Sequence, residues 1–112
     1  MQIQLITTGA RSGEPRPVTL YAWEDGDRLV IVASKGGSAR NPAWVHNLRA
    51  DPRARLTRGR ESVEVTAREV TGPDERARLW RLVVGRFPLY ATYQKRTERQ
   101  IPLFVLEQIH RD

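Results

Sequence analysis

The sequence predicts an α+β domain, mainly β, in which a few short helices accompany the strands. Turn-forming residues divide its 112 residues into short segments, and no repeat, linker or low-complexity tract interrupts them. This length suits one domain, residues 1–112, with a substantial core but no room for separate cofactor and substrate domains. A site is therefore expected on the surface of that core or between subunits.

The first half of the chain predicts three strands. Gln2 to Thr7 alternates apolar and polar residues, which favours a strand that ends at Gly9. Val18 to Trp23 is rich in β-forming residues, and Asp25-Gly26-Asp27 turns the chain back into Leu29 to Ala33. Because this third run is apolar at nearly every position, we expect both of its faces to be buried.

A short helix is expected after the third strand. Asn41 and Pro42 are typical of a helix start, with Asn as the cap and Pro at the first helical position. Pro52 ends the segment, so the helix should cover Ala43 to Ala50.

The second half predicts a hairpin, two helical pieces and a last strand. Arg53 to Thr57 and Ser62 to Val70 form the hairpin, and Pro73 opens the longest helix. Pro88 to Gln94 continues as a short helical piece, and Pro102 to Ile109 closes the chain as a strand. The expected order is β-β-β-α-β-β-α-β. Apolar residues at helical spacing mark the core face of the longest helix: Trp80, Val83, Val84 and Phe87.

Composition excludes several kinds of chemistry. Cysteine is absent, which rules out disulfides, thiolate metal sites and a cysteine nucleophile. Because His46 and His110 are the only histidines, we expect neither a Ser-His-Asp hydrolase nor a histidine-based metal site, and we assign no metal ligands. No apolar run approaches the roughly 20 residues that span a bilayer, and the N-terminus does not resemble a signal peptide. We therefore expect a soluble, cytoplasmic protein without a transmembrane segment.

The charge balance favours an anionic partner. Nineteen Lys and Arg residues against thirteen Asp and Glu residues give a formal net charge of +6. Nucleic acid, a phosphate group and a polycarboxylate would each fit this charge.

Two glycine-containing loops are candidate anion sites. The loop from Gly9 to Arg16, with the sequence GARSGEPR, combines two glycines, a serine and two arginines. Glycine lets backbone N–H groups approach an anion, and the arginine fork matches phosphate or carboxylate. The second loop, Ala33 to Gly37, delivers Ser and Lys into a Gly-Gly turn before a helix N-terminus. For the first loop, a solvated turn in an arginine-rich protein is the alternative interpretation.

A third motif lies on the predicted short helix. Trp44 and Leu48 share one face of that helix, and His46 and Asn47 are turned away from it. An ordinary surface histidine and a core tryptophan are the alternatives to a role in a site.

Taken together, the three motifs resemble those of a known family. G-x-R-S-G-x-P-R, V-A-S-K-G-G and N-P-A-W-x-H-N-L, in this order and at these separations, resemble the deazaflavin-dependent nitroreductases and F420H2-dependent quinone reductases. The likeness extends from Leu5 through Glu107 and includes Tyr90 to Gln94. It implies a split β-barrel of the FMN-binding, pyridoxamine-phosphate-oxidase type with short helices at its side. Ala10 stands where the family often has a basic residue.

The resemblance implies that coenzyme F420 is the cofactor. Arg11, Ser12 and Arg16 would then lie at its phosphate and oligoglutamate tail, with Lys35 close to the phosphate. The deazaflavin ring would lie against the strand Pro17 to Tyr21 and the segment Val32 to Lys35, and the short helix would enclose it. The predicted cofactor-binding residues are Ala10, Arg11, Ser12, Arg16, Val18, Thr19, Leu20, Tyr21, Val32, Ala33, Ser34, Lys35, Gly36, Asn41, Ala43, Trp44, Val45, His46 and Asn47.

The resemblance further implies hydride transfer from reduced F420 to a quinone, nitro-aromatic or activated enone acceptor. Tyr90 and Tyr93 would be the catalytic residues, because aromatic rings stack on flat substrates and a phenol donates a hydrogen bond to the reduced oxygen. Packing of both tyrosines against the barrel is the alternative.

Three other functions stay open from the residues. The same barrel could bind FMN, or bind F420 without catalysis. A basic nucleic-acid-binding domain could use Trp23, Trp44 and the arginines, although the resemblance implies no nucleic acid. A homodimer is left open as well.

Overall fold

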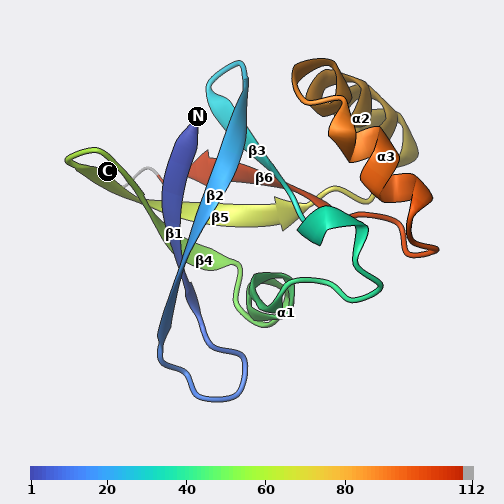
Figure 1. The fold of residues 1–112 in the computed structure, drawn as a ribbon. Helices are drawn as coiled ribbons and strands as arrows, with labels where there is room; N and C mark the ends of the chain where they lie inside the picture. The colour runs from blue at the N-terminus through green and yellow to red at the C-terminus, as the bar shows by residue number, and fades with distance from the viewer. Residues whose placement is uncertain (110–112) are drawn as a thin grey trace.

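Residues 1–109 are described by the computed structural model, so His110 and the end of the predicted domain lie outside it. Within this range, six antiparallel strands close into a barrel (Figure 1). The barrel and its accompanying helices confirm the predicted α+β fold class. The strands are β1 (Gln2–Thr8), β2 (Pro15–Asp25), β3 (Arg28–Val32), β4 (Arg53–Arg58), β5 (Glu61–Glu69) and β6 (Leu103–Gln108).

The order around the barrel is β1-β2-β3-β6-β5-β4. Strands that follow one another in the chain pair antiparallel in three cases: β1 with β2, β2 with β3, and β4 with β5. The last strand, β6, pairs with both β3 and β5. β1 closes the barrel, because Leu5 faces Val18 of β2 on one side and Leu56 of β4 on the other. Closure leaves no long unpaired strand edge between β1 and β4.

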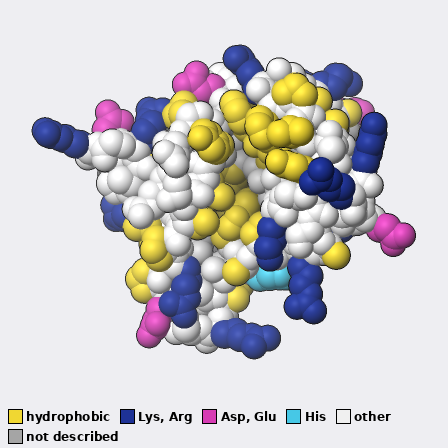
Figure 2. Space-filling view, viewed as in Figure 1, with side chains coloured by type: hydrophobic (Ala, Val, Ile, Leu, Met, Phe, Trp, Pro, Cys, Tyr) yellow, Lys and Arg dark blue, Asp and Glu magenta, His cyan; other side chains and the backbone are white. Residues whose placement is uncertain are grey.

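The helices are α1 (Ala43–Ala50), α2 (Pro73–Arg86) and α3 (Leu89–Lys95), with a 3-10 turn, η1 (Lys35–Gly37), before α1. α2 and α3 lie together beside β3 and β6, η1 contacts α3, and α1 contacts β1 (Figure 1). The predicted order of elements is confirmed, with η1 as an addition and with the predicted short helical piece present as a separate helix, α3. Figure 2 shows that this face of the molecule is hollowed and that hydrophobic side chains form the floor of the hollow.

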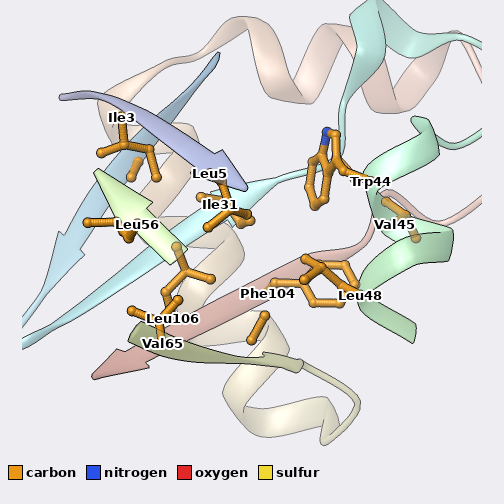
Figure 3. Close-up of a cluster of buried hydrophobic side chains, with 13 residues drawn as sticks. Ile3, Leu5, Ile31, Trp44, Val45, Leu48, Leu56, Val65, Phe104 and Leu106 are labelled. Atoms are coloured by element: carbon orange, nitrogen blue, oxygen red, sulfur yellow. The ribbon is translucent and has the colours of Figure 1, made fainter. Parts of the chain in front are cut away.

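Two hydrophobic clusters share the strands β3 and β6. Ile31 and Phe104 point into the barrel, where Trp44 and other side chains of α1 meet them (Figure 3). Val30 and Val105 point outward and pack under α2 and α3. Successive residues of a strand face opposite sides, so both faces of β3 are buried, as predicted.

The predicted cap of α1 is wrong. Pro42 (φ −59, ψ 153) is the N-cap residue, and no side chain caps the helix. The Asn41 side chain is engaged elsewhere, since its Oδ1 accepts a hydrogen bond of 2.8 Å from Nη1 of Arg99. A charged donor holds an amide oxygen more strongly than a neutral backbone N–H does.

The predicted core face of α2 is partly wrong. Leu79 and Val83 are the buried residues, whereas Trp80, Val84 and Phe87 are half-buried around them. The Arg76 guanidinium lies 5.6 Å from the Trp80 ring centroid and covers it, so Trp80 sits at the margin of the core. Among residues 1–109, no helix is long and apolar enough to cross a membrane.

Candidate active site

A cleft of about 1090 Å³ lies between β2, η1, α1 and the start of α3. Figure 2 shows hydrophobic side chains on its floor and Lys and Arg side chains around its border. Its lining residues are Gln2, Thr7, Gly9, Ala10, Arg11, Ser12, Arg16, Pro17, Val18, Thr19, Leu20, Tyr21, Val32, Ser34, Lys35, Pro42, Ala43, Trp44, His46, Asn47 and Tyr90.

The β1–β2 loop closes on itself at one end of the cleft. Gly9 N donates to Glu14 O at 2.8 Å, and Gly13 N donates to Gly9 O at 2.9 Å. Ser12 Oγ accepts from Glu14 N and from Nη2 of Arg16, each at 3.1 Å. The Arg16 guanidinium is therefore tethered beside the loop, and its exposed ion pair with Glu14 at 3.6 Å adds little to stability.

Asn47 anchors this loop to α1. Its Oδ1 accepts from Ala10 N at 3.0 Å, and its Nδ2 donates to Thr7 Oγ1 at 3.0 Å. Thr7 Oγ1 donates in turn to Arg16 O at 3.3 Å. Asn47 is buried, so its predicted position away from the packed face of the helix is wrong. Burial follows because one amide satisfies both a donor and an acceptor of β1 and its loop.

The η1 turn carries Lys35 to the cleft in an unusual backbone conformation. Lys35, Gly36 and Gly37 all have positive φ, at 44, 63 and 82. A Cβ on Gly37 would lie 2.6 Å from the backbone oxygen of Tyr93, so only glycine allows η1 to approach α3 this closely. A left-handed lysine costs about 1–2 kcal/mol, and such strain is commonly found at ligand sites.

Arg99 holds the segment around η1 in place. It donates from Nε to Ser38 O (2.7 Å), from Nη1 to Ala33 O (3.0 Å) and Asn41 Oδ1 (2.8 Å), and from Nη2 to Ser34 O (2.9 Å). Burial lowers the pKa of its guanidinium, which nevertheless stays charged at neutral pH. Arg99 thus fixes the loop that presents Lys35 without lining the cleft itself.

Tyr90 of α3 borders the cleft. Figure 1 shows α3 and the β1–β2 loop on opposite sides of η1 and α1. Its side chain is 7% exposed, and its hydroxyl accepts a hydrogen bond of 2.9 Å from Nε1 of Trp23. Burial raises the pKa of the Tyr90 phenol, so it is protonated at neutral pH. Tyr93 does not line the cleft; its ring lies near Phe87 and under the guanidinium of Arg96, whose centre is 5.6 Å from the ring centroid.

Most of the predicted cofactor-binding residues line this cleft, and four do not. Ala33 and Val45 are buried in the barrel core, Gly36 is exposed beside Lys35, and Asn41 is bonded to Arg99. Trp44 is both a site residue and a core residue: it lines the cleft, and it packs edge-on against Phe104 with ring centroids 5.7 Å apart.

The sequence did not predict some of the residues that line the cleft, nor Arg99, which holds the η1 segment in place. Gln2, Thr7 and Pro42 line the cleft without having been predicted to do so, whereas Gly9 belongs to the loop that was predicted as an anion site. Thr7 could have been found, because it continues the inward face of β1 as a polar residue that needs a partner. Arg99 had no comparable signal.

The electrostatics of the cleft favour an anion. Arg11, Arg16 and Lys35 line it, and no Asp or Glu is among its lining residues in the described part of the chain. Charges of one sign in a concave site attract the opposite charge from solution.

The closed barrel with a cation-lined cleft at its side defines a barrel protein with a candidate site for an anionic cofactor. The chain belongs to the F420H(2)-dependent quinone reductase family, whose sequence profile matches residues 1–108. It is therefore an F420-dependent reductase, as the resemblance implied.

Relatives and solved structures agree with this assignment. The chain is 45% identical over 104 residues to "F420H(2)-dependent quinone reductase Rv1261c" of Mycobacterium tuberculosis, covering 91% of this chain and 70% of the relative. It is 35% identical over 96 residues to "Putative F420H(2)-dependent quinone reductase Rv3178" of the same species, covering 86% and 80%.

Among solved structures, an F420-H2 dependent reductase, FDR-A, is 40% identical with a TM-score of 0.83, over 95% of this chain and 93% of that one. A structure described as a domain-swapped dimer is also 40% identical, with a TM-score of 0.85 over 95% and 79%. A putative pyridoxamine 5'-phosphate oxidase from Listeria innocua, at 11% identity and a TM-score of 0.66 over 97% and 84%, shares the fold alone.

Proposed function

We propose that the cleft binds coenzyme F420 together with a quinone and that the chain reduces the quinone with a hydride from the reduced coenzyme. One observation carries this proposal. A single cleft has a tethered Arg16 and a second cation, Arg11, at the β1–β2 loop and a buried phenol at α3, with no carboxylate among its lining residues in the range 1–109.

The lining residues fit the chemistry of F420. The coenzyme combines a flat deazaflavin ring with a phosphate and several tail carboxylates, and the cleft combines an apolar strand surface with three cations. Its volume of about 1090 Å³ lies just above the usual range of small-molecule sites, about 300–1,000 Å³. A coenzyme and a second flat molecule can share such a space.

The cations bind the anionic part of the coenzyme in this proposal. Arg16, held by Ser12, offers a forked donor to phosphate or carboxylate, and Arg11 and Lys35 add two further charges. One phosphate needs fewer charges than this set supplies. F420, with its tail carboxylates, should therefore bind more tightly than FMN.

The remaining residues orient the reactants. Val18 and Leu20 of β2 and the face of Trp44 offer apolar surface to a ring. Reduced deazaflavin supplies the hydride when it is bound, so the protein needs to hold the acceptor against the ring and exclude water. Tyr90 can donate a hydrogen bond to an acceptor oxygen that gains charge. Tyr93, which lies outside the lining, is not assigned this role.

Nitro-aromatic compounds and activated enones form the finer part of the proposal. Each is flat and gains negative charge on oxygen when it accepts a hydride, as a quinone does. The same phenol would therefore serve all three acceptor classes.

Parallel titrations with F420 and FMN, followed by fluorescence quenching, test cofactor binding. We expect F420 to bind more tightly and Arg16→Ala to weaken its binding by about 1.5 kcal/mol, the lower end for a charge-assisted bond because the guanidinium is exposed. Arg60→Ala removes the same charge from an exposed residue of the β4–β5 turn and is the control. Equal or tighter binding of FMN would contradict the proposal.

Steady-state oxidation of F420H2 by a short-chain benzoquinone, a nitro-aromatic compound and an enone then ranks the acceptors. Tight coenzyme binding with no turnover of any of them would indicate a binding module.

A homodimer stays a prediction. A solved structure that is 40% identical is described as a domain-swapped dimer, and light scattering of the purified protein tests whether this chain forms a dimer.

A further inference from the structure

The contact between Trp23 and Tyr90 fixes the hydrogen-bond polarity of the Tyr90 hydroxyl. Trp23 lies on β2 and Tyr90 on α3, and their rings meet edge to face at 6.3 Å with an interplanar angle of 84°. Nε1 of Trp23 is 2.9 Å from the phenol oxygen. An indole N–H can only donate, so the phenol oxygen must accept.

The phenol proton has no protein acceptor among residues 1–109. Within residues 1–109, the bond from Trp23 is the hydrogen bond that the Tyr90 hydroxyl makes. The hydroxyl belongs to a 7%-exposed side chain that lines the cleft. Since one lone pair is occupied and the ring is enclosed by Trp23 and Phe87, the cleft is the side on which the proton can find a partner.

We propose that Trp23 is a positioning residue that holds the Tyr90 hydroxyl as a hydrogen-bond donor toward the oxygen of the acceptor being reduced. This inference rests on the proposed function, because it places the acceptor in the cleft beside Tyr90. A donor whose direction is set before the reaction stabilises developing charge without reorganising.

The orientation of the Tyr90 hydroxyl decides whether it stabilises or repels the oxygen of the acceptor. A phenol free to rotate also presents its lone pairs to the cleft, and a lone pair repels an oxygen that gains negative charge. The Trp23 N–H occupies one lone pair of the hydroxyl oxygen and so disfavours this orientation. Burial raises the pKa of Tyr90, so the donor proton persists across the neutral pH range.

Kinetics of Trp23→Phe, Tyr90→Phe and the double variant test the inference, with F420H2 and a short-chain benzoquinone as reactants. Trp23→Phe keeps an aromatic ring and removes the N–H. We expect kcat/KM to fall roughly 3- to 10-fold, the effect of one hydrogen bond, with the loss in kcat. In the Tyr90→Phe background, the Trp23 change should cause no further loss, because Trp23 acts through the phenol.

A matched control is Trp80→Phe, which removes an indole N–H from a half-buried tryptophan of the same cluster that does not line the cleft. Its kcat and KM should equal those of the wild type. F420 affinity, read by fluorescence quenching, should be unchanged in all single variants, which separates positioning from general loosening.

Two results would overturn the inference: an unchanged kcat/KM in Trp23→Phe, or an equal loss in the presence and absence of the Tyr90 hydroxyl. Failure of the proposed function looks different, since wild-type protein would then bind F420 without oxidising F420H2 by any quinone. The Trp23 indole N–H resonance should also shift in Tyr90→Phe, which reports the contact independently of activity.

Discussion

The two loops that bring cations to the cleft are held by anchors of opposite character. The β1–β2 loop is held by the neutral amide of Asn47, through one donated and one accepted hydrogen bond. The segment around η1 is held by the charged guanidinium of Arg99, through four donated bonds. Neither anchor belongs to the loop that it fixes: Asn47 lies in α1, and Arg99 lies between α3 and β6.

The difference follows from what each loop presents to its anchor. The first presents an N–H, from Ala10, and a hydroxyl, from Thr7, so an amide with one acceptor and one donor group matches both. The second presents oxygen atoms only, and a guanidinium carries five N–H donors and no acceptor. The polarity of the loop groups therefore selects the anchor, independently of the charge that the loop shows to the cleft.

Of the substitutions around η1, Gly37→Ala should lower the free energy of unfolding the most. Its Cβ would lie 2.6 Å from the backbone oxygen of Tyr93, and φ is +82. We expect the free energy of unfolding to fall by about 3–5 kcal/mol. Gly36→Ala is the control, since φ is +63 there but nothing lies within 4 Å of the added carbon; only the backbone strain of about 1–2 kcal/mol applies. Equal losses in urea unfolding would contradict a role for close packing against α3.

Arg99→Ala should come next. It leaves three backbone oxygens and the Asn41 side chain without their donor, and we expect a loss of about 2–4 kcal/mol in unfolding free energy. Arg99→Lys keeps the charge but not the fork, so it should recover only part of the loss. F420 affinity should fall in both variants, because Lys35 is no longer held. A full recovery by lysine would mean that charge alone, and not the fork, anchors η1.

The order of strands and helices could be predicted from the sequence because its signals are local. Alternation in β1, the Asp25-Gly26 turn and Pro73 each act over a few residues. The residues that display chemistry to the cleft, such as Arg16 and Lys35, also lie in short recognisable motifs.

The anchors could not be predicted, for a physical reason. Arg99 bonds oxygens of residues 58 to 66 positions earlier, and a backbone carbonyl carries no residue identity that a sequence could reveal. The same contact made the predicted Asn41 cap wrong. Trp23 and Tyr90 are 67 positions apart, and their pairing depends on where α3 packs against β2. Tyr93, three residues after Tyr90, turns toward Arg96 and so misses the cleft.

Asn47→Ala tests the neutral anchor and should have a smaller effect than loss of Arg99. It leaves Ala10 N without its acceptor and Thr7 Oγ1 without the bond that Asn47 donates, which predicts a loss of about 1–3 kcal/mol in unfolding free energy. Thr7→Val in the same background should add less than it does alone, since the two side chains bond each other. Strictly additive losses in urea unfolding would show that Asn47 does not act through Thr7.

Ser12→Ala should have the smallest effect, because it changes how a cation is held without removing the cation. Ser12 Oγ accepts from Arg16 Nη2 and from Glu14 N in an exposed loop, so unfolding free energy should change by less than about 0.5 kcal/mol. The freed Arg16 side chain must then be ordered when the coenzyme binds, at about 0.5–1 kcal/mol, which predicts a roughly 2- to 5-fold weaker F420 affinity. Titration by fluorescence quenching measures it, and Ser12→Thr, which keeps the hydroxyl, should bind as the wild type does. If Ser12→Ala binds F420 with wild-type affinity while Arg16→Ala does not, the cation acts without its tether, and the β1–β2 loop relies on its Asn47 anchor alone.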